Sequence, residues 1–220
     1  MDLWAVVPVK ERGSAKERLA PMLRPQLRQA LALAMLEDVL VALTATPGIA
    51  GLLVVTVDPE AGRLAASWGA RLVEAGARDG HTGAVAAAMR LLVGEGRAAM
   101  LALPGDIPLV TPAEIARLLA VHPPAPSFTI VPSHDERGSN AIACSPPDAV
   151  PLRFGENSFY PHLQAAEARG LRPNVLHLPG IALDIDNPED VLSFMRIDVP
   201  TRARAVLAEQ PMQLVGGFRR

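Results

Sequence analysis

The sequence is poor in the residue types on which several classes of protein depend. Cys144 is the one cysteine among 220 residues, which excludes an internal disulfide and CxxC motifs and is typical of a reducing cytosol. Aromatic residues make up only 4% of the chain, too few for a platform that stacks single-stranded nucleic acid. The formal net charge of −2 offers no basic face either. We therefore expect a cytoplasmic protein with no nucleic-acid partner.

Long apolar runs are absent as well. No run reaches the length of a transmembrane helix. The apolar stretch at residues 3–9 lacks the order of a signal peptide, because Lys10, Glu11 and Arg12 follow it at once. The sequence holds neither a Walker loop nor a GxGxxG fingerprint. A hydrophobic fraction of 50% in 220 residues is enough for the core of one α/β domain, and no membrane partner is expected.

Strand-like and helix-like segments alternate along the chain. Apolar, β-branched runs such as residues 3–9 are typical of strands buried on both faces of a parallel sheet. The leucines over residues 26–44 recur with a helical period. The first five elements therefore predict a parallel sheet with right-handed crossovers. The predicted strands are residues 3–9, 52–58, 71–75, 101–103, 127–133, 141–147, 175–178 and 181–186, and the predicted helices are residues 26–44, 60–68, an alanine-rich segment within 76–96, 112–121, a segment ending at 169, 191–197 and 201–209.

The predicted strand pair within residues 127–147 interrupts this rhythm. A pair of this kind often forms the lid or the acceptor side of a site, and an edge hairpin that decorates the sheet is the alternative. The alanine-rich helix is expected to be capped by His81 or Thr82. His81 is given no catalytic role, since the sequence offers it no partner acid.

Three acids follow predicted strands. Asp106 comes just after residues 101–103, beside Pro104 and Gly105, which leave little side-chain bulk in the way of a ligand. Asp184 and Asp186 are two apart on a predicted strand, so both point to one face roughly 6.5–7 Å apart. Such like charges repel unless a cation lies between them, and oxygen ligands favour magnesium. The alternative is a set of exposed or capping acids.

A polar segment with several cations follows the first predicted strand. A loop in this place, with a glycine, is where α/β proteins hold phosphates. A solvated loop is the alternative, since neighbouring glutamates partly neutralise the charge. The residues concerned are Lys10, Arg12, Gly13, Lys16 and Arg18.

Two further glycine turns precede predicted helices. Gly80 lies before the alanine-rich helix, and Gly155 lies before a helix that Asn157 or Ser158 is expected to cap. The first amides of a helix are free to bind an anion. Plain capping is the alternative at both turns.

Six segments in this order resemble the guanylyltransferases of coenzyme F-420 biosynthesis, a branch of the nucleotidyltransferases. The resemblance covers about residues 3–195. The segments are VPVK at 7–10, AKERLA at 15–20, LPGDIPLV at 103–110, RGSNAI at 137–142, FGENSF at 154–159 and LDIDNPED at 183–190.

The resemblance implies a three-layer α/β/α nucleotidyltransferase fold with a mostly parallel sheet. From its length we expect one domain over residues 1–220, with residues 196–220 as a C-terminal helical extension. The implied reaction joins GTP to a phosphorylated three-carbon acid (phosphoenolpyruvate, 2-phospho-L-lactate or 3-phospho-D-glycerate) and releases pyrophosphate, with two Mg²⁺ ions. The apolar helices and the tail at 211–220 permit a homodimer without requiring one.

The resemblance also implies roles for individual residues. An acceptor phosphate is already ionised near neutral pH, so the reaction needs charge neutralisation and positioning rather than a general base. The implied catalytic residues are Lys16 and Asp106, the nucleotide-binding residues are Lys10, Gly13, Lys16, Arg18, Gly80 and Gly105, the acceptor-binding residues are Asn140, Gly155 and Ser158, and the metal ligands are Asp106, Asp184 and Asp186.

Two segments depart from the family pattern. Residues 138–140 read GSN where a GTGT-like turn is common, which leaves the acceptor open. Residues 77–82 read ARDGHT where a DPGxGLN-like loop is usual, which leaves the strictness of guanine preference open. The alternatives are a related transferase for another nucleotide or acceptor, such as a sugar phosphate or molybdopterin, and a non-catalytic nucleotide-binding α/β protein. The first usually begins with an LAAGxSxRMG-type loop, where this chain has VPVKERGSAK.

Overall fold

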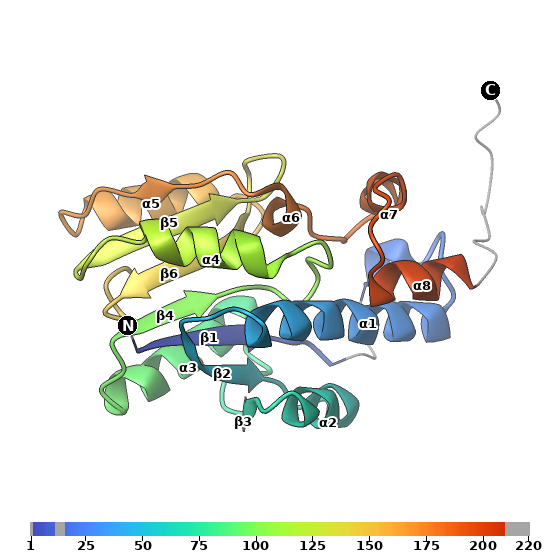
Figure 1. Ribbon diagram of the computed structural model, residues 1–220, viewed down its shortest axis with the longest axis horizontal. Coiled ribbons are helices and arrows are strands. Elements are labelled where there is room, and N and C mark those ends of the chain that lie inside the picture. Colours follow the sequence, from blue (N-terminus) through green and yellow to red (C-terminus); the bar gives the residue numbers. More distant parts are fainter. Residues whose placement is uncertain (1, 12–15, 210–220) are drawn as a thin grey trace.

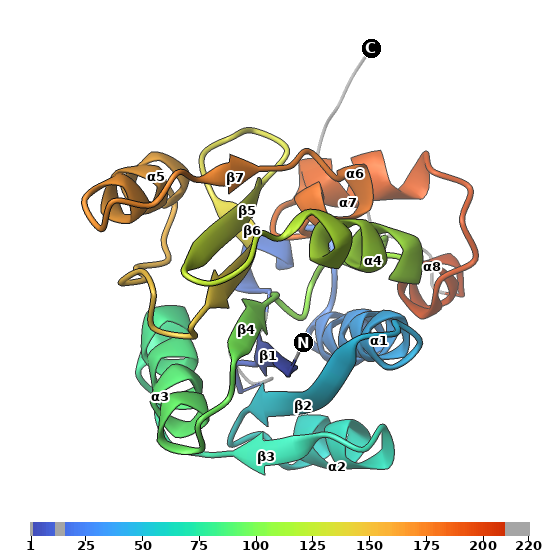
Figure 2. The ribbon, with the colours of Figure 1, turned by 60° about the vertical axis from the view of Figure 1, so that its left-hand side comes forward.

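The protein has an α/β/α architecture in three layers. A computed structural model describes residues 2–11 and 16–209. One face of the central sheet is covered by α1 (Pro25–Thr44), α2 (Pro59–Ser67) and α4 (Pro112–Val121), and the other by α3 (Gly80–Gly94) and α5 (Phe159–Glu167), as Figures 1 and 2 show. The fold predicted from the sequence is therefore confirmed.

The sheet of the described residues has seven strands in the order β3-β2-β1-β4-β6-β5-β7. The first four run parallel, as predicted, and β7 runs parallel to β5, whereas β6 is antiparallel to both β4 and β5. The predicted strand pair is thus β5 and β6, and it lies inside the sheet, so its interpretation as an edge hairpin is wrong. The strands are β1 (Leu3–Pro8), β2 (Ile49–Val55), β3 (Arg71–Val73), β4 (Ala99–Ala102), β5 (Ser127–Pro132), β6 (Ser139–Ser145) and β7 (Asn174–Val175).

Alternation along the strands distributes apolar side chains between the two helical layers. Leu3, Ala5 and Val7 of β1 lie in the cluster formed with α1, α2 and α4. Val6 points the other way, into the cluster formed with α3. All four side chains are fully buried. A strand buried on both faces needs no polar positions, which explains the unbroken apolar run at the N-terminus.

Side chains that accept backbone hydrogen bonds fix several helix starts. Asp58 accepts from Glu60 N and Ala61 N at the start of α2, and Thr111 accepts from Glu114 N at the start of α4. The predicted cap of α3 is wrong, because His81 and Thr82 lie inside its first turn and Asp79 holds the N-cap position without a side-chain bond. The remaining helical segments are η2 (Glu17–Leu19), α6 (Pro179–Ala182), α7 (Pro188–Met195) and α8 (Arg202–Ala208).

The predicted strand at residues 181–186 is also wrong. Pro179 begins the short helix α6, and residues 183–187 follow it as an irregular segment outside the sheet. Ile185 N donates to Asp106 O (3.0 Å), which ties this segment to the end of β4. Ile185 itself is buried, as its alternation with the two acids predicted.

The C-terminal helices pack on the first helix. Val191 and Phe194 of α7 share an apolar cluster with Met35 of α1. At the start of α8, Asp38 of α1 accepts hydrogen bonds from Arg202 N and Ala203 N (2.9 and 3.0 Å). The tail at 211–220 lies outside the described residues. Among the helices that the structure does describe, none is long and apolar enough to cross a membrane.

Candidate active site

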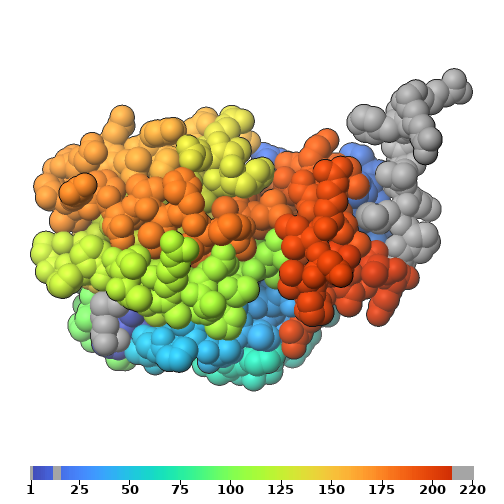
Figure 3. Space-filling view, turned by 45° about the horizontal axis from the view of Figure 1, so that its top comes forward, coloured from blue at the N-terminus to red at the C-terminus, as the bar shows by residue number. Residues whose placement is uncertain are grey.

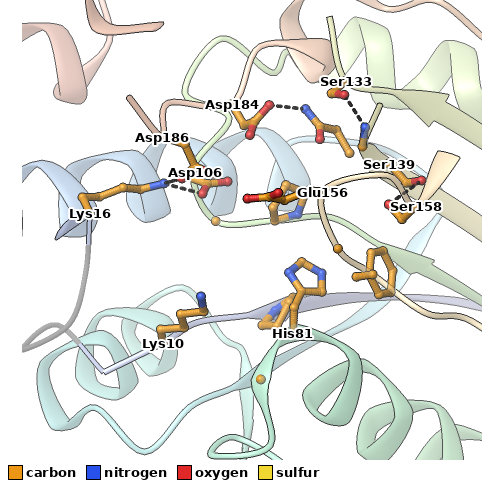
Figure 4. A pocket seen from close by; sticks show the side chains of 18 of the residues that line it. Lys10, Lys16, His81, Asp106, Ser133, Ser139, Glu156, Ser158, Asp184 and Asp186 are labelled. Atoms are coloured by element: carbon orange, nitrogen blue, oxygen red, sulfur yellow. Dashed lines mark hydrogen bonds and ion pairs between the residues drawn. The ribbon is translucent and has the colours of Figure 1, made fainter. Parts of the chain in front are cut away.

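A cavity of about 900 Å³ opens at the edge of the sheet where β1 and β4 end (Figure 4). From β1 the chain proceeds outward to β2 and β3, whereas β4 leads to the other half of the sheet. This is the switch point at which open α/β sheets bind ligands. Both lysines of the chain, Lys10 and Lys16, line the cavity, together with Asp106 from the end of β4 and Asn140 from the start of β6.

Lys16 joins two of the predicted acids. Its Nζ donates to Asp106 Oδ2 (2.5 Å) and to Asp186 Oδ1 (2.7 Å), and 9% of its side chain is exposed. Burial alone would lower the pKa of Lys16, but the two carboxylates outweigh burial and raise it above its usual value. Burial would likewise raise the pKa of Asp186, and the Lys16 ammonium lowers it. Lys16 and Asp186 therefore stay charged, and sequence positions 16, 106 and 186 meet at one point.

Asp184 lies beside this cluster, and its pKa is shifted in the opposite direction to that of Asp186. Burial, and then the Asp106 carboxylate, raise the pKa of Asp184 to about 6. Its Oδ1 accepts a hydrogen bond from Asn140 Nδ2 (3.0 Å), which also donates to the carbonyls of Ile181 and Ala182. The Asn140 amide, expected at the acceptor, thus holds the acid-bearing segment to β6.

The carboxylates fit a hard divalent cation in their chemistry. Within the described residues, no group of three His, Cys, Asp or Glu side chains is arranged as a metal site. Asp106 Oδ1 is nevertheless buried with no hydrogen-bond partner in the part of the chain that the structure describes, and burying a carboxylate oxygen in this way is costly. Asp106 also repels Asp184. A cation between these two carboxylates would remove both costs.

The remaining residues expected at the nucleotide line the same cavity, apart from Gly13, which lies outside the described residues. Gly80 has a φ of 72°, a left-handed conformation that glycine adopts without strain. Arg18 donates to Glu156 Oε1 (2.6 Å) across the mouth, between two exposed side chains. The His81 ring packs on Phe154 with centroids 4.3 Å apart, and burial lowers the pKa of His81 to about 4. His81 is therefore neutral at pH 7.

The opposite end of the cavity is built from hydroxyl groups and turns. Gly155 and Ser158, both expected at the acceptor, line it. Ser158 Oγ donates to Ser139 Oγ (3.2 Å), and Figure 4 shows the two side by side. Ser158 holds the N-cap position of α5 but makes no capping bond, so its hydroxyl is left to donate to Ser139.

Three polar residues at this end were missed by the sequence analysis. His162 Nδ1 lies 3.0 Å from Ser139 Oγ, and Thr82 Oγ1 accepts from Phe154 N (3.0 Å). Ser139 precedes Asn140 in the RGSNAI segment at 137–142, and His162 lies one helical turn after Ser158. The 3.6-residue period of α5 could have indicated that His162 lies on the same helix face as Ser158.

Comparison with known proteins gives a consistent result. A family model described as "Guanylyl transferase CofC like" matches residues 3–210. A phosphoenolpyruvate guanylyltransferase of Rubrobacter xylanophilus is 43% identical over 194 residues, which cover 87% of this chain and 92% of that protein. A 3-phospho-D-glycerate guanylyltransferase of Colwellia psychrerythraea is 35% identical over 187 residues, covering 84% and 88%. A crystal structure from Desulfovibrio desulfuricans, described as a nucleotide-diphospho-sugar transferase, superposes with a TM-score of 0.71 at 19% identity over 94% of both chains, which supports the fold alone.

Proposed function

Because the chain belongs to the CofC-like guanylyl transferase family, we propose that it joins GTP to a phosphorylated three-carbon acid and releases pyrophosphate, as a step of coenzyme F-420 biosynthesis. The observation that best supports this function is a single cavity that has a lysine between two carboxylates at one end and a hydroxyl-lined turn at the other. The first end suits a triphosphate, and the second suits a small anionic acceptor. Residues 1–220 would act as one domain in the cytoplasm, with residues 196–220 as its extension.

The proposed mechanism is an in-line displacement. An ionised phosphate oxygen of the acceptor attacks the α-phosphorus of GTP, the bond to the β-phosphate breaks, and pyrophosphate leaves with its electron pair. No general base is required, and one of the histidines that line the cavity, His81, is neutral and packed on Phe154. The chain supplies position and charge compensation.

Lys16 would move its hydrogen bonds from the carboxylates to the phosphates. Its ammonium stays protonated, so it would offset the charge that develops on the leaving pyrophosphate. Lys10 and Arg18 line the same cavity and would add positive charge around the phosphates. Gly80 and Gly105 would let the nucleotide approach the backbone closely.

Magnesium is part of this proposal. Asp106, Asp184 and Asp186 would hold it, supported by the orphaned oxygen of Asp106 and by the raised pKa of Asp184. When bound, Mg²⁺ would neutralise charge on the phosphate oxygens of both reactants. Asn140 would keep Asp184 oriented toward the cavity, through the hydrogen bond that it already donates.

Phosphoenolpyruvate is the favoured acceptor. The relative named for it is 43% identical, whereas the relative named for 3-phospho-D-glycerate is 35% identical. Gly155 and Ser158 would bind the acid, and Ser158 offers a hydroxyl at the cavity wall.

Pyrophosphate release tests the function directly. The protein is incubated with GTP and each of phosphoenolpyruvate, 2-phospho-L-lactate and 3-phospho-D-glycerate, with and without Mg²⁺. Release that requires one of these acids and Mg²⁺ is the expected result. Parallel reactions with ATP, CTP and UTP test guanine preference. If no pyrophosphate is released with any of the three acids in the presence of GTP and Mg²⁺, the proposal is wrong.

A further inference from the structure

A buried imidazole lies behind the hydroxyl-lined end of the cavity. His162 is 1% exposed and does not line the cavity itself. Its Nε2 lies 2.9 Å from Arg153 N, and its Nδ1 lies 3.0 Å from Ser139 Oγ. It therefore connects helix α5, strand β6 and the segment that leads to Gly155.

These contacts fix where the imidazole carries its proton. The Arg153 backbone N–H can only donate, so Nε2 must accept and holds no hydrogen. The neutral ring then carries its proton on Nδ1 and donates to Ser139 Oγ. Burial lowers the pKa of His162 to about 4, which keeps the ring neutral at pH 7. A histidine in this tautomer cannot take a proton from Ser139, so a Ser–His nucleophile is excluded.

The tautomer in turn sets the direction of the Ser139 hydroxyl. Its oxygen receives one hydrogen from His162 and a second from Ser158 (3.2 Å). Both lone pairs are then used, and the Ser139 proton can only be donated. The described residues provide no acceptor for it. Ser139 is 9% exposed and lines the cavity, so the proton is available to a ligand there.

We propose that His162 is a positioning residue that turns the Ser139 hydroxyl proton into the cavity, where Ser139 donates it to an anionic oxygen of the acceptor. This inference rests on the proposed function for the identity of the acceptor. The oxygen belongs to a carboxylate or a phosphate, which share the chemistry of a charged hydrogen-bond acceptor. Thr82 supports the same end, because its Oγ1 exchanges hydrogen bonds with Phe154 N and Phe154 O (3.0 and 3.3 Å).

The main variants are His162→Gln and Ser139→Ala. Glutamine keeps an acceptor for Arg153 N but removes the donor to Ser139, and alanine removes the hydroxyl with little change in volume. Each is expected to raise the KM for the acceptor about 10- to 100-fold, the usual cost of losing a hydrogen bond to a charged group, while the KM for GTP stays within about twofold. The double variant is expected to be no worse than either single one, since both remove the same bond.

His122 provides a matched control at the other end of β6. It is also a buried imidazole bonded to hydroxyls, with Nδ1 2.8 Å from Thr129 Oγ1 and Nε2 2.9 Å from Ser145 Oγ. His122→Gln removes comparable contacts away from the cavity and is expected to leave the KM for the acceptor unchanged. Competition by lactate and by inorganic phosphate distinguishes the two anions. The variants are expected to weaken inhibition by one of them, and unchanged inhibition by both would overturn the proposal.

Nitrogen NMR of the full chain with ¹⁵N-labelled histidine tests the tautomer without any turnover. The expected signal of His162 at pH 7 has a protonated Nδ1 and an unprotonated Nε2. The opposite tautomer, a native acceptor KM in Ser139→Ala, or additive effects in the double variant would each overturn the inference. If the wild-type protein uses none of the three acids, the proposed function fails instead. The NMR result still decides the orientation of Ser139.

Discussion

The two ends of the cavity use opposite means to meet an anion. At one end, Lys16 forms ion pairs with Asp106 and Asp186, and the pKa shifts of Lys16 and Asp186 keep both of these groups charged. At the other end, Ser139, Ser158 and His162 form a neutral network in which only the direction of protons matters. A charged cluster gives strong attraction but little selectivity, because Coulomb forces act on any phosphate. A directed network discriminates between ligands, because a wrong partner leaves a buried group unpaired.

The largest expected effect comes from breaking the charged end. Asp106→Asn removes the carboxylate shared by Lys16 and the proposed cation, and we expect turnover to fall at least about 100-fold. The melting temperature should change little, since the substitution also removes repulsion with Asp184. Steady-state pyrophosphate release and thermal unfolding give the two numbers. Asp198→Asn, at a fully exposed acid on the surface, is the matched control. A variant with near-native turnover at saturating Mg²⁺ would remove Asp106 from the site.

At the neutral end, the buried His162 should make the stability of the protein depend on pH. The unfolded chain binds a proton at histidine near pH 6.5, whereas folding lowers the pKa of His162 to about 4. The stabilisation by His162 is therefore complete above about pH 6.5 and is lost as the pH falls toward about 4, by up to about 1.4 kcal/mol for each pH unit.

Urea unfolding of the wild type and of His162→Gln between pH 7.5 and 4.5 measures this slope. The variant should lose less stability on acidification than the wild type. The difference isolates the histidine from Asp184, whose raised pKa acts in the opposite direction. Parallel curves for the two proteins would show that His162 is not held neutral.

A smaller effect is expected on metal affinity at the charged end, where the Lys16 ammonium and a divalent metal ion would compete for the same carboxylates. Lys16→Met removes the ammonium that lies between Asp106 and Asp186, so Mn²⁺ should bind about tenfold more tightly in the absence of nucleotide, which corresponds to about 1.4 kcal/mol. Electron paramagnetic resonance of free Mn²⁺ measures the affinity. Lys10→Met, at the other lysine of the cavity, should change it less, since Lys10 donates to neither carboxylate in the described structure. Unchanged Mn²⁺ affinity in Lys16→Met would place the cation elsewhere.

The smallest effect is expected where the two ends touch. Arg18 and Glu156 form an ion pair between exposed side chains, and pairs of this kind contribute at most about 1 kcal/mol. Glu156→Gln should therefore leave the free energy of unfolding nearly unchanged and release Arg18 for the nucleotide, with a modest fall in the KM for GTP. A rise in the KM for GTP would show that Glu156 orients Arg18 instead of competing for it.

The sequence identified the charged end better than the neutral one, for physical reasons. Asp106 stood out because Pro104 and Gly105 end a buried strand, a signal carried by adjacent residues. Asp184 and Asp186 were recognised, but their perfect alternation suggested a strand that has no neighbouring strand to pair with. Alternation indicates which face a residue occupies, and Ile185 is indeed buried, but it cannot supply hydrogen-bond partners.

The neutral end depends on contacts between distant residues. Ser139 and His162 are adjacent only because α5 packs on β6, through Phe159 and Ile142 of one apolar cluster. The position of β6 between β4 and β5 was likewise not predictable, since consecutive antiparallel strands pair equally well at a sheet edge. Asn140 shows the same limit, because its place in the turn was visible but its bond to Asp184 was not.

The reversed direction of β6 has a consequence for how such a site can diversify. Because β6 runs against β4, its first residues, Ser139 and Asn140, reach the edge where β4 ends. They directly follow the turn at residues 133–138, whose middle is exposed. Changes of length or sequence in that turn can reshape the hydroxyl-lined end of the cavity while β1 and β4 keep their register and Lys16 keeps its carboxylates. The half of the sheet proposed to bind the nucleotide and the half proposed to bind the acceptor can therefore evolve at different rates.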